Sequence, residues 1–365
     1  MISRLFDVIS RRIDGPLMVA LVLTLALGLT VVYSATGGAS ADRVIAQSRN
    51  IAIAAAALWI VANIPPQALM RLAVPIYSAG LVLLVGVALF GEVRNGARRW
   101  LNLGFTTIQP SEVMKIAVPL VLAWYFHRHQ ERIGLRDYAV AAILLALPVG
   151  LVVRQPDLGT ALLVSASGFF VIFLAGLSWK VLATVFASGM VSLPFVWGML
   201  HDYQRARVLT LLDPTEDPLG AGYHIIQATI AIGSGGVLGK GWLNGTQAQL
   251  DFVPERSTDF ILAVFGEEFG LAGNLVLIVL YIIIVARGLM IAANASTTFA
   301  RLMAGAVTLT FFTYAFVNMG MVSGILPVVG VPLPMVSYGG TALLSMLAGF
   351  GILMSISTHK QLVSS

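Results

Sequence analysis

The chain contains about ten long apolar runs, and these runs limit the folds that it can adopt. Each is close to the roughly 20 residues that a helix needs to cross the hydrocarbon core of a bilayer. The runs cover approximately 16–36, 48–66, 70–91, 111–128, 137–154, 158–176, 179–200, 259–288, 301–323 and 338–358. Lipid offers the backbone no hydrogen-bond partners, and the runs lack the alternation of a β-barrel. The sequence therefore predicts an all-α polytopic membrane protein.

The composition agrees with this prediction. The 365 residues are 58% hydrophobic and 11% charged, whereas soluble domains carry roughly 25% charged residues. The absence of cysteine excludes disulfides, thiolate metal sites and cysteine nucleophiles. A net charge of +5 does not predict nucleic-acid binding here, because the basic residues lie in short loops beside apolar runs. In that position they set membrane orientation and contact anionic lipid.

The distribution of Lys and Arg predicts how the chain lies in the membrane. Ten spans place both termini on one side, and the cytoplasmic side is normally the more basic one. The N-terminus and the even-numbered connections hold Arg4, Arg11, Arg12, Arg71, Arg128, Arg132, Arg136, Lys180, Arg287, Arg301 and Lys360. The short odd-numbered connections hold only Arg43, Arg49, Arg94, Arg98, Arg99 and Arg154. We therefore expect both termini in the cytoplasm.

One connection is much longer than the others. Residues 201–258 join the seventh and eighth predicted helices, and the orientation above places them on the outer face. Long loops in compact proteins are usually functional or disordered. This loop carries several aromatic residues and an apolar stretch over 225–238. We expect it to fold back on the bundle with an interfacial or re-entrant helix. Residues 1–365 then form a single transmembrane domain that contains this loop.

Ionisable groups at membrane depth are costly and usually functional. Five acidic residues lie in or at the ends of predicted spans: Glu112, Asp157, Asp259, Glu267 and Glu268. The only Lys or Arg placed inside a span is Lys115. Because Glu112, Asp157 and Asp259 all begin predicted helices at the outward-facing side, we expect them to converge on one outer cavity.

Each of these groups has a structural and a functional interpretation. Asp259, together with Ser257 and Thr258, could cap the helix that follows. Alternatively, it is a general base at the boundary of membrane and water, because an Asp is ionised at neutral pH and partial burial raises its basicity. Glu112 and Lys115 are three residues apart on one helix face. They form either an internal salt bridge or a polar patch that shapes a cavity.

Basic clusters flank these groups and could bind a diphosphate through charge-assisted hydrogen bonds. They comprise Arg98, Arg99, Arg205, Arg207, Lys240 and Arg256. The alternative is that they are solvated loop charges. The glycine-rich run at 233–241 does not have the spacing of a nucleotide-binding loop, and is better interpreted as a flexible turn or a close-packing segment. The five histidines are scattered, so the sequence predicts no metal site.

Ordered motifs along nearly the whole chain resemble those of the SEDS family (shape, elongation, division and sporulation). They include Gly-Ala-Arg-Arg-Trp-Leu at 96–101, Gln-Pro-Ser-Glu at 109–112 and Gln-Pro-Asp-Leu-Gly-Thr at 155–160. Pro-Glu-Arg-Ser-Thr-Asp-Phe at 254–260, Gly-Ile-Leu-Pro-Val-Val-Gly at 324–330 and Ser-Tyr-Gly-Gly at 337–340 follow. Each motif is weak alone, but their common order is specific.

The resemblance implies a peptidoglycan glycosyltransferase that links lipid II into β-1,4 glycan strands in the bacterial cytoplasmic (inner) membrane. Asp259 matches the essential aspartate of the family, and we assign it the role of base. Glu112 and Lys115 would support the cavity, with Asp157 and Glu268 as further candidates. A divalent cation, Mg²⁺ or Mn²⁺, is an expectation from the family alone. The run at 241–247 favours the elongation branch over the division branch.

The family also implies partners, namely a class B penicillin-binding protein and other proteins of the elongation complex. Lipid II and membrane lipid are the expected ligands, and no nucleic acid is expected. Two other functions fit ten spans with charges inside the membrane. One is a transporter that flips lipid II, and the other is an inactive scaffold for the transpeptidase. Clustering of the acidic residues at outer helix ends favours chemistry there over transport.

Overall fold

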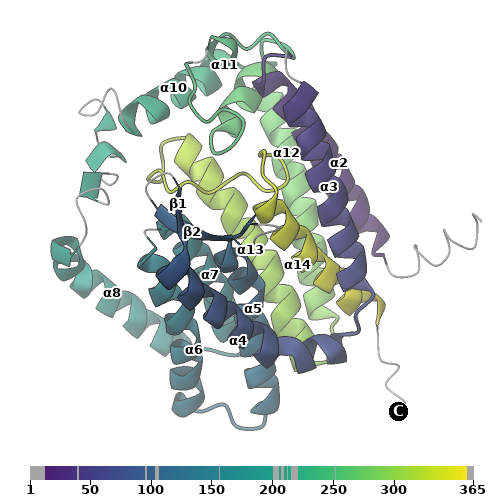
Figure 1. The fold of residues 1–365 in the computed structure, drawn as a ribbon, viewed down its shortest axis with the longest axis vertical. Helices are drawn as coiled ribbons and strands as arrows, with labels where there is room; N and C mark the ends of the chain where they lie inside the picture. The colour runs from purple at the N-terminus through teal and green to yellow at the C-terminus, as the bar shows by residue number, and fades with distance from the viewer. Residues whose placement is uncertain are drawn as a thin grey trace, which may run out of the picture.

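The computed structural model describes residues 13–38, 41–94, 97–102, 107–155, 157–199, 205–206, 209–211, 213–214, 221–250 and 252–359. Within these residues a helix lies at each of the ten predicted positions (Figure 1). They are α2 (Gly15–Ala35), α3 (Ala41–Ala62), α4 (Pro66–Phe90), α5 (Pro110–Arg128), α6 (Leu135–Val153), α7 (Leu158–Leu174), α8 (Trp179–Met199), α12 (Ile261–Ala293), α13 (Thr298–Val322) and α14 (Thr341–Thr358). The predicted bundle of helices is thus confirmed.

Seven of these helices are long and apolar enough to cross a membrane, namely α2, α3, α4, α6, α12, α13 and α14. The shorter helices α7 and α8 are also apolar. Helix α5 is different, because Glu112 and Lys115 lie in its first turns. It packs against α4, α6, α7, α13 and α14, and Met114, Val118 and Phe126 are fully buried. Its charged residues therefore face protein rather than lipid.

The helices pack closely where glycine replaces a larger side chain. Small residues let helix backbones approach each other in membranes, where helices gain little from the hydrophobic effect. Helix α14 packs along α3, and a Cβ added to Gly351 would lie 2.6 Å from the carbonyl oxygen of Leu58. Helix α12 packs between α2 and α13. In contrast, α8 extends away from the other helices (Figure 1).

A small antiparallel sheet follows α4, which the all-α prediction missed. It consists of β1 (Glu92–Arg94), β2 (Ala97–Asn102) and β3 (Thr107–Ile108), in the order β1-β2-β3. The strands pair Val93 with Arg98 and Leu101 with Ile108. The strands are two to six residues long. Such short segments carry too little periodicity to be distinguished from a loop in the sequence.

The long connection before α12 folds back on the bundle, as predicted, in the part that the structure describes. It contains α10 (Ala221–Ser234) and the short α11 (Thr246–Gln249). Both helices pack on α12, and Ala228 and Ala231 of α10 are fully buried. The apolar stretch of the sequence therefore marks α10. The predicted start of the eighth span at residue 259 was two residues early, because α12 begins at Ile261.

We expect Gly351→Val to lower the apparent melting temperature in detergent, because the new side chain must displace the α3 backbone. Overpacking of this kind typically costs roughly 1–3 kcal/mol. Gly189→Val in α8 is the matched control, since a Cβ there meets nothing within 4 Å. Thermal unfolding of the two purified variants is the measurement. Equal melting temperatures would contradict close packing of α14 on α3.

Candidate functional site

Helix α12 is broken at Gly270, whose φ of 62° and ψ of −159° are not helical. The loop that follows α10 supplies the missing backbone hydrogen bonds. The amides of Leu271 and Ala272 donate to the carbonyls of residues 236 and 237 at 3.0 and 2.9 Å. In return, the amides of residues 240 and 241 donate to the carbonyls of residues 267 and 268. The break in α12 is therefore a stable part of the fold, because a second segment satisfies its backbone groups.

The glycine-rich run at 233–241 is this second segment, and it packs closely against α12. A Cβ at Gly239 would lie 2.1 Å from the carbonyl oxygen of Glu268, and its φ of 79° also favours glycine. A Cβ at Gly235 would lie 2.1 Å from the carbonyl oxygen of Gly266. Of the two interpretations of the run, the structure shows the close-packing segment.

Two buried carboxylates lie on α12 just before the break. Glu267 accepts hydrogen bonds from Lys240 Nζ at 2.7 Å and from the backbone amides of Gln247 and Ala248 at 2.9 and 3.2 Å. Glu268 accepts a hydrogen bond from the Ser34 hydroxyl of α2. Because an unpaired buried charge is costly, these contacts tie the loop and α2 to this part of α12.

Asp259 lies in a turn just before α12, and its side chain is half-buried. The N-cap position of α12 is occupied by Phe260, whose side chain makes no capping hydrogen bond. Ser257 instead accepts a hydrogen bond from Arg43 at 2.8 Å, and Thr258 donates to the Glu255 carboxylate at 2.7 Å. The hydroxyls of Ser257 and Thr258 are therefore engaged by Arg43 and Glu255 rather than by the first amides of α12.

The backbone of this turn is held by hydrogen bonds from other segments of the chain. The carbonyls of residues 257–259 accept, in order, from the Tyr338 amide at 2.8 Å, the Ser337 hydroxyl at 2.6 Å and the Asn318 amide group at 2.8 Å. Asn318 of α13 is fully buried and also donates to the Val331 carbonyl at 2.7 Å. Three consecutive carbonyls are thus fixed by α13 and by the segment that leads to α14.

Helix α3 holds this segment in turn. Gln47 is 1% exposed; it donates to the carbonyl of Ser337 at 3.3 Å and accepts from the amide of Gly339 at 3.2 Å. Neither Gln47 nor Asn318 was predicted from the sequence. Asn318 is an uncharged polar residue inside an apolar run, which is a signal that could have found it, whereas Gln47 lies in a polar stretch before the predicted span and gave no such signal.

A cavity of about 530 Å³ lies beside this turn. It is lined by Arg43, Val253, Pro254, Glu255, Arg256, Ser257, Thr258 and Tyr338. Two guanidinium groups, one carboxylate and three hydroxyls therefore line one space, and most of the lining residues immediately precede Asp259 in the chain. The Asp259 carboxylate itself lies beside Gly330, where an added Cβ would be 3.4 Å from Oδ2.

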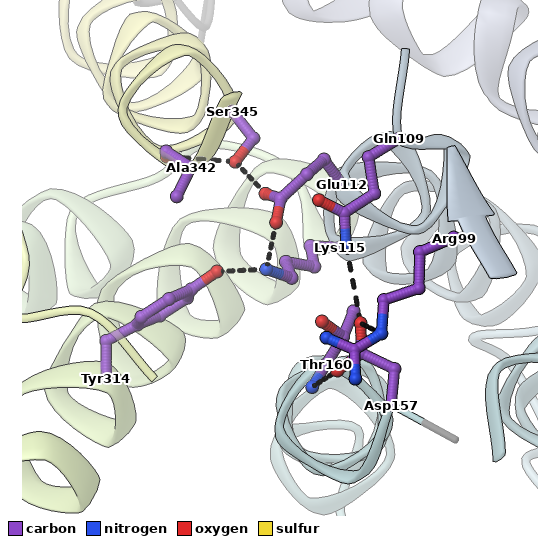
Figure 2. A network of polar contacts seen from close by, with 9 residues as sticks. All are labelled: Arg99, Gln109, Glu112, Lys115, Asp157, Thr160, Tyr314, Ala342 and Ser345. Atoms are coloured by element: carbon purple, nitrogen blue, oxygen red, sulfur yellow. Dashed lines mark hydrogen bonds and ion pairs between the residues drawn. The ribbon is translucent and has the colours of Figure 1, made fainter. Parts of the chain in front are cut away.

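A second polar network lies inside the bundle (Figure 2). Lys115 Nζ donates to Glu112 Oε1 at 2.7 Å and to the Tyr314 hydroxyl, and all three side chains are buried. The other oxygen of Glu112 accepts from the Ser345 hydroxyl at 2.7 Å. Of the two interpretations of this pair, the internal salt bridge is therefore present, and its hydrogen bonds to Tyr314 and Ser345 join α5 to α13 and α14. Removing one partner of such a pair typically costs roughly 3–5 kcal/mol.

Asp157 connects the small sheet to α7 (Figure 2). Its carboxylate caps α7 by accepting from the amide of Thr160 at 3.1 Å. The same group accepts from Gln109 at 3.4 Å and lies 3.6 Å from Nε of Arg99. Asp157 thus caps α7 and also holds β2 in place through Arg99.

Glu112, Asp157 and Asp259 were predicted to converge on one outer cavity, but none of them lines the cavity of Arg43 and Arg256. Each is instead linked, directly or through its partners, to one short segment, residues 329–331. The first turn of α7, capped by Asp157, meets this segment where a Cβ at Gly159 would lie 2.6 Å from the carbonyl of Val329. Tyr314, the partner of Lys115, packs against Val331 in one buried cluster. Asp259 lies beside the glycine between them.

The basic residues predicted to bind diphosphate are more dispersed. Arg256 lines the cavity, whereas Lys240 pairs with Glu267. Arg205 donates to the carbonyls of residues 197 and 198 at the end of α8. Arg98 is exposed and donates to a carbonyl of α4 at 3.4 Å. Arg207 lies outside the described residues.

The expected divalent cation finds no evident set of ligands. In the described part of the chain, no group of three or more His, Asp or Glu side chains could hold a metal ion. The two acidic residues nearest the turn, Glu255 and Asp259, make no such set. We therefore derive the chemistry of this site from the side chains alone.

Comparison with known proteins agrees with the family that the motifs indicate. The family model of cell cycle proteins that covers FtsW, RodA and SpoVE matches residues 16–362. The peptidoglycan glycosyltransferase MrdB of Escherichia coli strain K12 is 51% identical over 356 residues, which cover 97% of this chain and 95% of that protein.

Two solved structures share the fold. A chain of a peptidoglycan synthase complex, in which polymerization and crosslinking are coordinated, superposes with a TM-score of 0.82 at 34% identity. The match covers 95% of this chain and 99% of that one. The rod shape determining protein RodA of Thermus thermophilus superposes with a TM-score of 0.72 at 29% identity, over 95% and 98%. The chain therefore belongs to the SEDS family of multi-pass membrane proteins, which includes FtsW, RodA and SpoVE, and it is a peptidoglycan glycosyltransferase.

Proposed function

We propose that this protein polymerises lipid II into β-1,4 glycan strands during cell elongation, with Asp259 as the general base. One observation carries the assignment of the base. A half-buried carboxylate follows a turn whose backbone is fixed at three consecutive carbonyls, beside a polar cavity that contains two guanidinium groups. A base must be accessible to its substrate and fixed in position, and Asp259 meets both conditions.

The chemistry is a single displacement at the anomeric carbon of the donor sugar. The 4-hydroxyl oxygen of the acceptor forms the new bond to this carbon, and the bond to the lipid diphosphate breaks. The hydroxyl proton passes to the Asp259 carboxylate, while the electron pair of the broken bond leaves with the diphosphate. Attack opposite the leaving group converts the α-linked donor into the β-linked product.

The leaving diphosphate needs positive charge beside the reacting carbon. Arg43 and Arg256 suit this role best, because both line the cavity before Asp259. Guanidinium groups bind phosphate oxygens through two parallel hydrogen bonds. Arg43 was considered in the sequence only for membrane orientation, and its place at the start of α3 gave no sign of this cavity.

The buried pair of Glu112 and Lys115 supports the site indirectly. Through Tyr314 it fixes α13 against α5, and α13 carries Asn318, which holds the catalytic turn. We further propose that the chain acts with a class B penicillin-binding protein, the transpeptidase that crosslinks the new strands. The synthase complex that contains a similar chain supports this partner. Both termini are proposed to be cytoplasmic, which puts the site at the outer face.

Two rival functions are separated by one experiment. A lipid II flippase or an inactive scaffold would not make glycan from lipid II in detergent, where no membrane separates two compartments. We expect the purified protein, with its transpeptidase partner, to form polymer that can be resolved on a gel. Absence of polymer under conditions in which the partner is active would favour the scaffold or the flippase.

The variant Asp259→Asn should fold and bind its partner but form almost no glycan. Loss of a general base typically costs about 10²–10⁴ in rate. Polymer formed from labelled lipid II is the measurement. The control is Asp42→Asn, which removes an exposed carboxylate from α3 and should retain full activity. Near-normal polymerisation by Asp259→Asn would remove this residue from the mechanism.

Substitution of Arg43 by Gln should weaken both substrate binding and turnover, because the cavity loses half of its guanidinium groups. One charge-assisted hydrogen bond contributes roughly 1.5–3 kcal/mol, so kcat/KM should fall by at least tenfold. Arg49→Gln on the same helix is the matched control, since Arg49 does not line the cavity. Equal kcat/KM values for the two variants would show that Arg43 does not contact the diphosphate.

The buried amide of Asn318 should matter for turnover rather than for substrate affinity. Asn318→Leu leaves the carbonyls of Asp259 and Val331 without their donor, so the carboxylate loses its fixed position. We expect kcat to fall at least tenfold while KM for lipid II changes little. The control is Asn63→Leu, which removes a comparable hydrogen bond to the Trp59 carbonyl at the exposed end of α3. A rise in KM with unchanged kcat would contradict a positioning role.

A further inference from the structure

A groove lies between α4 and α6, and none of the candidate-site residues described above lines it. Its volume is about 750 Å³, which is within the roughly 300–1,000 Å³ of typical ligand sites. Aliphatic side chains such as Val82, Val85 and Leu147 form its walls, and Arg154 is the one charged residue that lines it. Gly150 also lines it, and an added Cβ there would meet nothing within 4 Å. The groove therefore has free space at this position of α6.

The guanidinium of Arg154 is placed to bind a ligand. Arg154 ends α6 as its C-cap residue, and its side chain is exposed. Within the part of the chain that the structure describes, this side chain makes no hydrogen bond or ion pair. A charged, unpaired group next to lipid is costly unless an anion from the membrane pairs with it. Arg154 therefore needs a counter-ion, and the described part of the protein does not provide one.

We propose that the α4–α6 groove binds an anionic glycerophospholipid, with an acyl chain along the aliphatic walls and the phosphate on Arg154. The complementarity has two parts, an apolar trough for the chain and a single positive charge at its end for a single phosphodiester. A diphosphate lipid suits it less well. The cavity with two guanidinium groups lies elsewhere, beside Asp259.

The absence of cysteine from the chain permits a direct test with one engineered label. Val82→Cys places a fluorophore at the rim of the groove, where the native side chain is 71% exposed. The protein is reconstituted in phosphatidylcholine vesicles that contain either brominated phosphatidylglycerol or brominated phosphatidylcholine. Bromine quenches the label on contact, so the ratio of the two quenching constants reports lipid preference.

We expect brominated phosphatidylglycerol to associate with the Val82 label about fivefold more strongly than brominated phosphatidylcholine. This ratio corresponds to the roughly 1 kcal/mol that one basic residue contributes beside anionic lipid. A label at Leu275 of α12, which is 52% exposed and outside the groove, should show no preference. Equal quenching by both lipids at Val82 would overturn the proposal.

Two further variants test the two parts of the site separately. Arg154→Gln should abolish the preference, whereas Arg136→Gln at the opposite end of α6 should retain it. Gly150→Phe should also abolish it, because the ring fills the trough without a clash. A preference that survives Gly150→Phe would show that Arg154 only attracts lipid at the surface. Displacement of the brominated lipid by a polyprenyl diphosphate at far lower concentration would identify the substrate as the occupant instead.

Discussion

Charged groups inside an apolar bundle must find their partners in the protein, because neither lipid nor the packed helices can solvate them. Here that requirement also holds the helices together. Lys115 contacts Glu112 on its own helix and Tyr314 on α13, and Ser345 extends the same network to α14. Glu267 likewise secures the loop after α10 through Lys240. These buried charges therefore join elements that are distant in sequence. Loss of one partner would weaken the contacts among all the elements that it joins.

The break at Gly270 illustrates the same requirement for the backbone. A helix that is interrupted leaves amides and carbonyls without partners, and these groups must be satisfied by another segment. The glycine-rich run approaches closely enough to do so only because it lacks side chains at Gly235 and Gly239. The first two turns of α12 are consequently fixed by the loop as well as by the rest of the helix. The turn with Asp259 is therefore supported by the loop after α10 as well as by α12 itself.

Much of the fold followed from the sequence, because the length of an apolar run reports directly on the thickness of the bilayer. The ten helix positions and the folding back of the long loop were predicted, and the salt bridge of Glu112 with Lys115 was one of two interpretations of that pair. The small sheet was not predicted, since its strands are too short to show a period. The partners of the Asp259 turn were missed for a different reason. Gln47, Asn318 and Ser337 act through hydrogen bonds to the backbone, and such contacts link segments whose proximity no local pattern reveals.

The way in which Asp259 is held bears on its proposed role as a base. A general base must keep its position while the hydroxyl of the acceptor sugar approaches it. The turn is fixed at three consecutive backbone carbonyls by residues of other segments. The side chain of Asp259 is half-buried rather than enclosed, so in the proposed reaction a sugar hydroxyl can approach it without displacing the groups that hold these carbonyls.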